Sequence, residues 1–257
     1  MQSFDLTDKV AIITGGSRGI GREIALALAE AGAKVVVASR KQAGVDEVAA
    51  EIEKRGGTAL AIAAHTGQED AVAALVERTV EAFGGVDIAV NNAGTNPHFG
   101  RLVTATAAQW DKIMEVNLRG AFFLCQQVIP VMQERGGGKI INVASVAGVK
   151  PQPAMGIYSV SKAGLIMLTQ VLAQELGPFN IQVNALAPGI IKTRFSSVLW
   201  QTPSIAEAIE EHTPLGRLGA VEDVVGAALY LASPLSDYVT GAVLLIDGGM
   251  NVAGFFG

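Results

Sequence analysis

The chain has 257 residues, of which 50% are hydrophobic and 17% are charged, and its net charge is −5. This composition is typical of a globular protein with a sizeable core and excludes an intrinsically disordered chain. Lys and Arg form no cluster, which argues against a nucleic-acid-binding surface. Cys125 is the only cysteine, so an internal disulfide framework is excluded as well.

The N-terminal stretch MQSFDLTDKV is polar and acidic, and it lacks the basic start and the apolar run of a signal peptide. The best membrane candidate, residues 121–132, is short and contains Gln126, Gln127 and Pro130, so we expect a buried helix there. We therefore expect a cytoplasmic protein with no membrane partner.

Short apolar runs rich in β-branched residues alternate with helix-length segments along the whole chain. Most runs are continuously apolar, as strands covered on both faces must be. Several expected helices end at a glycine, a common helix terminator: Gly32, Gly56, Gly84, Gly136 and Gly177. The expected strands are 10–14, 34–39, 59–64, 86–91, 139–145, 181–187 and 242–247, and the expected helices are 23–31, 45–54, 69–83, 107–134 and 159–176.

Alternation of strands and helices predicts an α/β fold: one domain over residues 1–257 with a Rossmann-type, doubly wound parallel sheet of about seven strands flanked by helices. Ligands bind such sheets at the carboxyl ends of the strands. Functional residues are therefore expected just after each strand.

A glycine-rich turn, TGGSRGIG at 14–21, follows the first expected strand and precedes a helix. Its glycines allow a tight turn and a close backbone approach to a pyrophosphate, and the helix N-terminus favours an anion. The spacing G-x-x-x-G-x-G differs from the commoner fingerprint, and an ordinary strand–helix turn is the alternative. We expect the turn to bind a dinucleotide through Gly15, Ser17, Arg18, Gly19, Ile20 and Gly21.

The end of the second expected strand should meet the adenosine ribose. A carboxylate there would favour NAD(H), but the chain has Ser39 followed by Arg40 and Lys41. Together with Arg18, these cations suit a 2′-phosphate. We predict a preference for NADP(H) over NAD(H); the alternative is that the cations are solvated loop charges.

Tyr158 and Lys162 are four residues apart in the segment YSVSK, which places them on one face of a helix. A phenol is a poor acid or base near neutral pH, but a nearby ammonium lowers its pKa. Ser145, thirteen residues earlier at the end of the fifth expected strand, could fold back beside Tyr158 and hold a substrate oxygen. Without Ser145, an ordinary pair of surface side chains four residues apart on a helix would explain the spacing of Tyr158 and Lys162 equally well.

These pieces, with NNAG at 91–94, Asn117 and NALAPGIIKT at 184–193, resemble the classical short-chain dehydrogenase/reductase family over nearly the whole chain. The resemblance implies that Tyr158 exchanges a proton with the substrate oxygen. It also implies that Lys162 lowers the tyrosine pKa and binds the nicotinamide ribose, that Ser145 orients the carbonyl, and that Asn117 holds a water linked to Lys162.

The resemblance also implies further cofactor contacts, which come from Asn92, Ala93, Gly94, Pro188, Gly189, Ile191 and Thr193. The chain departs from the family after the third strand, where His65 stands in place of the usual aspartate. We expect His65 to stack on the adenine or to hydrogen-bond with it.

A narrower resemblance, carried by SRKQ (39–42), residues 96–100 and APGIIKTRFSSVLW (187–200), is to the NADP-dependent carbonyl reductase/retinol dehydrogenase subgroup. It implies reduction of hydrophobic ketones or aldehydes. We expect a substrate-covering lid over about 189–217 and a pocket formed by Ser145, His98, Phe195 and Trp200.

Two alternatives remain at this stage. A 3-oxoacyl-carrier-protein reductase would need a basic docking surface, for which Arg119, Arg135 and Lys139 are the candidates. A cofactor-sensing protein without catalysis is the other.

Three further expectations complete the interpretation. The three histidines lack metal-ligand spacing, so no metal is expected, and Cys125 is expected in the core. Segments 107–134 and 159–176 are more apolar than one sheet face requires, and relatives in the family pair these helices, which predicts a homotetramer.

Overall fold

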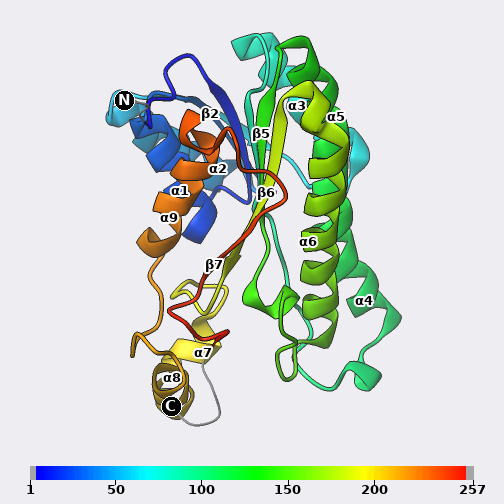
Figure 1. Ribbon diagram of the computed structural model, residues 1–257, viewed down its shortest axis with the longest axis vertical. Helices are drawn as coiled ribbons and strands as arrows, with labels where there is room; N and C mark the ends of the chain where they lie inside the picture. Colours follow the sequence, from blue (N-terminus) through cyan, green and yellow to red (C-terminus); the bar gives the residue numbers. More distant parts are fainter. Residues whose placement is uncertain (1–3, 253–257) are drawn as a thin grey trace.

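The computed structural model describes residues 4–252, so the first three residues of the N-terminal stretch considered above lie outside it. Its centre is a seven-stranded sheet in which every neighbouring pair is parallel, with the order β3-β2-β1-β4-β5-β6-β7 (Figure 1). The strands are β1 (Val10–Thr14), β2 (Lys34–Ser39), β3 (Thr58–Ala63), β4 (Ile88–Asn91), β5 (Gly138–Val143), β6 (Ile181–Pro188) and β7 (Val243–Ile246). The predicted doubly wound sheet is confirmed.

Helices connect the strands, and short 3-10 turns lie at Leu102–Thr104, Val146–Gly148, Gly177–Phe179 and Pro234–Ser236. The helices are α1 (Gly19–Glu30), α2 (Gln42–Lys54), α3 (Glu69–Phe83), α4 (Ala107–Met114), a π-helical turn (Glu115–Arg119), α5 (Gly120–Glu134), α6 (Gly156–Leu176), α7 (Ser197–Gln201), α8 (Pro203–Glu211) and α9 (Glu222–Ala232).

The sheet is covered on both faces, as the continuously apolar strands require (Figure 1). Helices α1, α2 and α9 lie on one face, and α3, α5 and α6 lie on the other. Successive residues of β1 alternate between the two cores: Ile13 packs with the first group of helices and Ile12 with the second. Each such aliphatic side chain contributes roughly 1.5–3 kcal/mol on full burial, so these two cores supply most of the fold's stability.

The structure corrects several predicted boundaries. Strand β5 ends at Val143, so Ser145 lies just beyond it and caps the 3-10 turn that follows. Gly32, Gly56, Gly84 and Gly136 adopt positive φ after their helices, but Gly177 does not, because the chain continues there into a 3-10 turn.

Helix α9 was not predicted from the sequence. Its buried side chains Val224, Ala228 and Leu231 complete the core between the sheet and α1.

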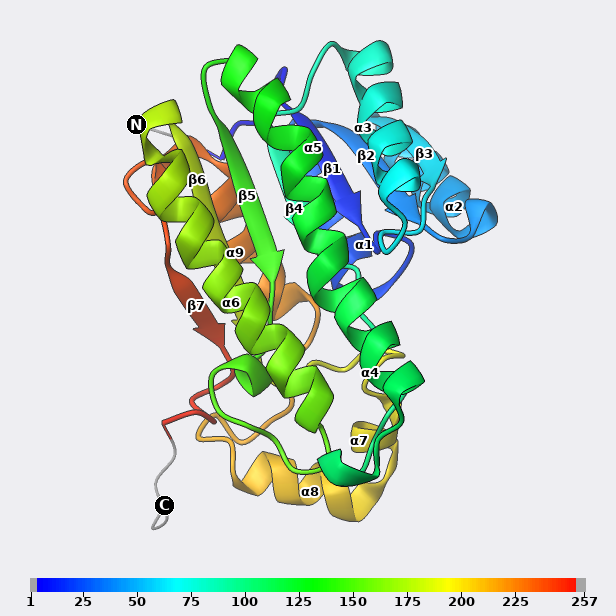
Figure 2. The ribbon, with the colours of Figure 1, turned by 90° about the vertical axis from the view of Figure 1, so that its right-hand side faces the viewer.

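Helix α6 and its 3-10 turn, residues 156–179, are long and apolar enough to cross a membrane by length and composition alone, which the sequence analysis did not anticipate. Half of the segment's most apolar window is buried, as in the core helix of a globular fold. Figure 2 shows α6 lying along the sheet beside α5.

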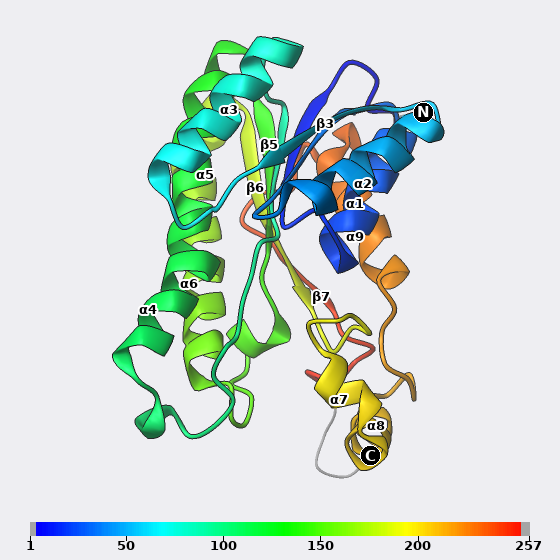
Figure 3. The same cartoon turned by 180° about the vertical axis from the view of Figure 1, so that it is seen from behind.

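The strands point toward one end of the molecule, where α4, α7 and α8 gather (Figures 2 and 3). The strand order reverses between β1 and β4, so the switch point at which doubly wound sheets bind ligands opens at this end.

Candidate active site

The glycine turn after β1 is packed tightly against the segment after β4. The Asn92 side-chain amide donates to the carbonyl oxygens of Thr14 and Gly15, at 2.9 and 3.1 Å. A Cβ at Gly15 would lie 2.9 Å from the Ala93 Cα, and one at Gly21 would lie 2.6 Å from the Gly15 carbonyl oxygen and overlap the Asn92 amide. Only glycine fits at these two positions, because the turn packs directly against the segment after β4.

The remaining residues of the turn lie around this cradle. Gly19 has a φ of +56° and begins α1, Arg18 directly precedes it, and Ser17 and Ile20 are partly exposed. The helix therefore directs its free N–H groups at the site of the expected pyrophosphate.

Cations without a protein partner lie beside the turn. Arg18, Arg40 and Lys41 are exposed, and none forms an ion pair within the part of the chain that the structure describes. A Cβ at Gly44 would lie 3.3 Å from the Ser17 Cβ, so the start of α2 packs on the glycine turn. Ser39, at the end of β2, adds no negative charge.

Tyr158 and Lys162 lie on the first two turns of α6, and both are buried, with 8% and 3% of their surface exposed. The Lys162 ammonium donates to the Val143 carbonyl oxygen at 2.7 Å and lies 5.7 Å from the centre of the Tyr158 ring. Ser145 also lies against the phenol, since the two side chains share a hydrogen bond. The structure thus brings Ser145, from the segment after β5, together with Tyr158 and Lys162 on α6.

Burial governs the ionisation of this pair. It raises the pKa of the Tyr158 phenol to about 12, while the hydrogen bond with Ser145 acts in the opposite direction. Burial also lowers the pKa of the Lys162 amine to about 8. Desolvation is therefore the largest influence on the phenol, and the expectation that Lys162 lowers the tyrosine pKa stays a prediction.

Asn117 reaches the same site from a π-helical turn between α4 and α5. Its amide donates to the Thr95 carbonyl oxygen and to Ser161 Oγ, both at 3.0 Å, and its Oδ1 accepts from the Thr95 N–H at 2.8 Å. A Cβ at Gly94 would lie 3.7 Å from Asn117 Oδ1 and 3.8 Å from Lys162 Nζ, so both groups lie close to the segment after β4.

The sequence analysis predicted one uninterrupted helix over 107–134 and so missed the π-turn. Such turns are frequent at functional sites. No residue pattern in the segment marked it, because its geometry depends on how the helix packs.

His65 faces helix α4. Its Nδ1 accepts from the Gly67 N–H at 3.0 Å, and its Nε2 lies 3.1 Å from the Lys112 ammonium and 3.8 Å from Glu115. Both ring nitrogens therefore have protein neighbours, which leaves the ring face, not a hydrogen bond, for the predicted adenine contact.

The segment after β6 closes the cleft from the other side. Pro188 ends β6, and a Cβ at Gly189 would lie 2.9 Å from the Asp247 Cα. Ile191 is buried, and Thr193 lies against the glycine turn, since a Cβ at Gly19 would be 3.5 Å from Thr193 Cγ2.

The predicted pocket residues occupy different positions. The Phe195 ring lies 5.9 Å from the Tyr158 ring, whereas the Trp200 indole donates to the Thr193 carbonyl oxygen at 2.9 Å within the predicted lid. His98 is buried in the loop after β4, and its Nδ1 has no hydrogen-bond partner among residues 4–252. That loop is fixed to the start of α6 by the Gly100 N–H, which donates to the Ala154 carbonyl oxygen at 2.9 Å.

Two other side-chain groups bear on the chemistry. Within the described residues, no three His, Cys, Asp or Glu side chains are grouped as metal ligands. Cys125 is buried in α5, and burial raises the pKa of its thiol to about 12, so it is a packed side chain and not a nucleophile.

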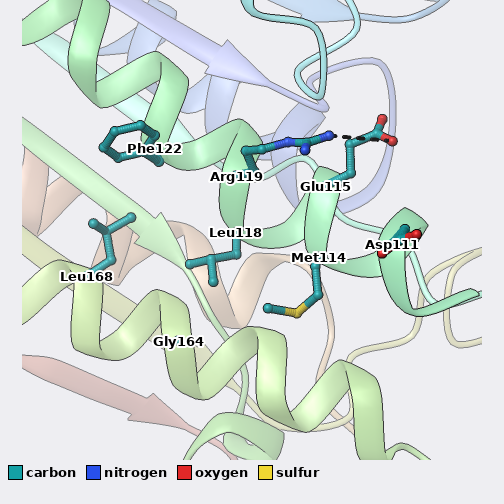
Figure 4. A pocket seen from close by; sticks show the side chains of 8 residues that line it. All are labelled: Asp111, Met114, Glu115, Leu118, Arg119, Phe122, Gly164 and Leu168. Carbon is teal, nitrogen blue, oxygen red and sulfur yellow. Dashed lines mark ion pairs between the residues drawn. The ribbon is translucent and has the colours of Figure 1, made fainter. Parts of the chain in front are cut away.

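A groove of about 820 Å³ lies away from this cleft, between the α4–α5 segment and α6 (Figure 4). Its walls are mainly apolar, with an ion pair between Arg119 and Glu115 at one side. The residues that line it are Asp111, Met114, Glu115, Leu118, Arg119, Phe122, Gly164 and Leu168.

Comparisons with known proteins agree with this geometry. A family model described as enoyl-(acyl carrier protein) reductase matches residues 15–251. Dehydrogenase/reductase SDR family member 4 of Sus scrofa is 43% identical, with 95% of this chain and 88% of the relative aligned.

Solved structures give the same result. A protein of Sinorhizobium meliloti described as a short-chain alcohol dehydrogenase superposes with a TM-score of 0.94 at 38% identity, over 98% of this chain and 99% of that one. A Beutenbergia cavernae protein described as an NAD(P)-dependent gluconate 5-dehydrogenase with bound NADP has a TM-score of 0.92 at 36% identity, over 97% and 99%. The chain is an oxidoreductase that acts on CH–OH groups and belongs to the short-chain dehydrogenase/reductase family.

Proposed function

We propose that the protein reduces hydrophobic ketones or aldehydes with NADPH and that Tyr158, Lys162, Ser145 and Asn117 form its catalytic group. The observation that carries the proposal is the convergence of Tyr158, Lys162 and Ser145 in a buried position at the carboxyl end of the sheet. All four side chains are retained, which disfavours a sensor that has lost catalysis.

The ionisation of Tyr158 suits reduction. With its pKa raised to about 12, the phenol stays protonated at neutral pH and can donate its proton to a carbonyl oxygen as the alcohol forms. Ser145 donates a second hydrogen bond to that oxygen, and Lys162, with a pKa of about 8, would replace the proton through a water bound near Asn117. The nicotinamide of a cofactor held by the glycine turn through its pyrophosphate would supply the hydride.

Free cations near the glycine turn support the preference for NADP(H). Arg18 and Arg40 form no ion pair with described residues, so a 2′-phosphate would not compete with an internal carboxylate. The Beutenbergia cavernae protein is described with NADP bound. The glycine turn that opens α1 would hold the pyrophosphate of either cofactor.

Exposed apolar side chains support a hydrophobic substrate. Phe195 is 56% exposed, and its ring lies 5.9 Å from the Tyr158 ring. Val198, in the same segment, and Phe99 and Val103, in the loop after β4, are exposed as well. Exposed apolar groups are typical of a surface that binds an apolar partner or ligand. The lid over about 189–217 would cover them when substrate binds.

A carrier-protein substrate is less well supported. The three cations considered for docking an acidic carrier already have carboxylate neighbours. Arg135 pairs with Asp87 at 3.1 Å, Lys139 pairs with Asp237 at 2.7 Å, and Arg119 lies 3.9 Å from Glu115.

The decisive experiment is a screen of NADPH oxidation across ketones, aldehydes, quinones and acetoacetyl thioesters, with the Tyr158→Phe variant as the control. We expect the wild type to turn over hydrophobic carbonyls and the variant to bind NADPH normally yet lose nearly all activity, because only the proton donor is missing. General acid catalysis contributes ~10²–10⁴-fold to the rate. A Tyr158→Phe variant that keeps more than about a tenth of the wild-type kcat would therefore rule out Tyr158 as the acid.

A further inference from the structure

Three buried polar side chains join strand β4, strand β5 and helix α6. Asn91 Nδ2 donates to Asn142 Oδ1 at 2.9 Å, and Asn142 Nδ2 donates to Thr169 Oγ1 at 2.8 Å. Thr169 in turn donates to the Leu165 carbonyl oxygen at 2.8 Å, within α6. Asn142 and Thr169 are fully buried, and Asn91 and Asn142 are direct partners in the parallel sheet.

Each member of this network is close in sequence to a part of the site. Asn91 directly precedes Asn92, which holds the glycine turn through Thr14. Asn142 lies three residues before Ser145 on the chain that leaves β5. Thr169 lies two helical turns after Lys162, on the same face of α6.

Apolar packing does not by itself fix where α6 lies along the sheet. Leu165, Leu172 and Leu176 are buried side chains of α6, but apolar contacts are non-directional and tolerate small displacements. A hydrogen bond requires a narrow range of distance and angle. The Asn142–Thr169 bond therefore selects one axial position of α6 relative to β5.

Stability alone does not explain two amides in this layer. A buried hydrogen-bonded pair adds little net stability over apolar groups of the same shape, because both partners lose water on folding. Thr169 could be replaced by the isosteric valine with no change of volume, so the hydroxyl is the feature that requires a reason.

We propose that Asn142 and Thr169 are positioning residues that hold Tyr158 and Lys162 at the correct distance from Ser145 and the cofactor cleft. The inference rests on the proposed function, since it assigns these residues to the geometry of that catalytic group. They touch neither substrate nor cofactor and act through the position of α6.

The test compares Thr169→Val with Thr169→Ser in NADPH-dependent carbonyl reduction. Thr169→Val should lower kcat at least about tenfold, since a displacement of reacting groups near 1 Å lowers the rate by up to ~10²-fold. The Kd for NADPH should stay within about twofold of the wild-type value, because the glycine turn is untouched. Thr169→Ser keeps the hydroxyl and should recover kcat to within about threefold of the wild type.

Thr79→Val is the matched control. Thr79 is also fully buried in a helix, α3, and its hydroxyl donates to the Leu75 carbonyl oxygen at 2.7 Å, but it forms no hydrogen bond to another element among residues 4–252. This variant should destabilise the protein less than Thr169→Val, which leaves the Asn142 amide N–H unpaired, and it should leave kcat unchanged. Equal kcat in Thr169→Val and Thr79→Val would overturn the inference and reduce Thr169 to a core residue.

Two further outcomes keep the inference separate from the proposed function. If Thr169→Val does not fold, Thr169→Ala takes its place, and a kcat equal to that of Thr169→Ser overturns the inference. An inactive wild type across the whole screen contradicts the proposed function and the inference with it. An active wild type with a fully active Thr169→Val contradicts the inference alone.

Discussion

Lys162 is a buried amine whose ionisation opposes folding. Its pKa is 10.5 in an unfolded chain and about 8 in the fold, a difference worth about 3 kcal/mol. Between pH 8 and pH 10.5 the unfolded chain binds more protons at Lys162 than the folded protein does. The free energy of unfolding therefore rises with pH across this range, and below about pH 8 the full cost of burying the charged amine remains. The residue therefore carries a stability cost at physiological pH.

Replacing Lys162 with methionine should consequently raise the stability of the protein at pH 7. The gain should be about 2 kcal/mol once the lost hydrogen bond to Val143 is subtracted, or a Tm increase of about 4–8 °C. Thermal unfolding of Lys162→Met at pH 7 and pH 10, at one protein concentration, measures it.

The gain should shrink at the higher pH, where the native lysine is neutral. Lys150→Met, a change at an exposed lysine, should show no such pH dependence. A Lys162→Met variant less stable than the wild type at both pH values would show that the amine is stabilised in the fold.

Cofactor choice is also decided by single residues. Arg40→Ala should lower kcat/KM for NADPH by one to two orders of magnitude and affect kcat/KM for NADH far less. The reason is that a charge-assisted hydrogen bond to the 2′-phosphate contributes roughly 1.5–3 kcal/mol. Ser39→Asp should shift preference toward NADH by charge repulsion with the 2′-phosphate. Equal effects of Arg40→Ala on both cofactors would mean that Arg40 is a solvated loop charge.

Helices α7 and α8, within the predicted lid, have no buried residue of their own, so little apolar packing holds them to the rest of the protein. Segments of this kind open readily. Phe195, just before α7, lies against the Tyr158 ring and links this segment to α6.

Phe195→Ala should therefore raise KM for large hydrophobic ketones about tenfold, since an aromatic contact and its apolar area contribute ~1–2 kcal/mol. The KM for a small ketone such as acetone should change little, and kcat/KM values for the two substrates give the comparison. A uniform effect on both would place Phe195 outside the substrate pocket.

Elements also show where sequence patterns fail. The seven strands follow from apolar runs, and α3 matches its expected bounds over residues 69–83. The π-turn around Asn117 and the helix α9 were missed, because the first depends on packing against α6 and the second on completing a core made by distant segments.

At the scale of the molecule, the groove between the α4–α5 segment and α6 is an apolar face that no other part of residues 4–252 fills. Phe122, which lines it, is 44% exposed, and Met167, about one helical turn after the lining residue Gly164 on α6, is 59% exposed. We expect two copies to bury it by pairing α5 and α6 across a two-fold axis, within the proposed homotetramer.

Met167→Arg should accordingly lower the sedimentation mass at micromolar concentration, because a buried unpaired charge is costly. Val103→Arg, at an exposed apolar residue in the loop after β4, is the control and should leave the assembly intact. A wild type that sediments as a monomer would rule out the tetramer.

The sequence by itself determined the fold class and the local features of the site. Strand–helix alternation, the glycine turn and the spacing of Tyr158 and Lys162 are written in neighbouring residues, and such patterns depend on local geometry alone. The edge of the sheet at which the site lies follows from the same alternation.

Only the tertiary structure decided how the site is tuned. It brought Asn117 to helix α6, turned His65 toward Lys112, and buried Tyr158 and Lys162 so that their pKa values moved apart. These outcomes depend on desolvation and on contacts between segments far apart in the chain, and neither is encoded in a local pattern of residues.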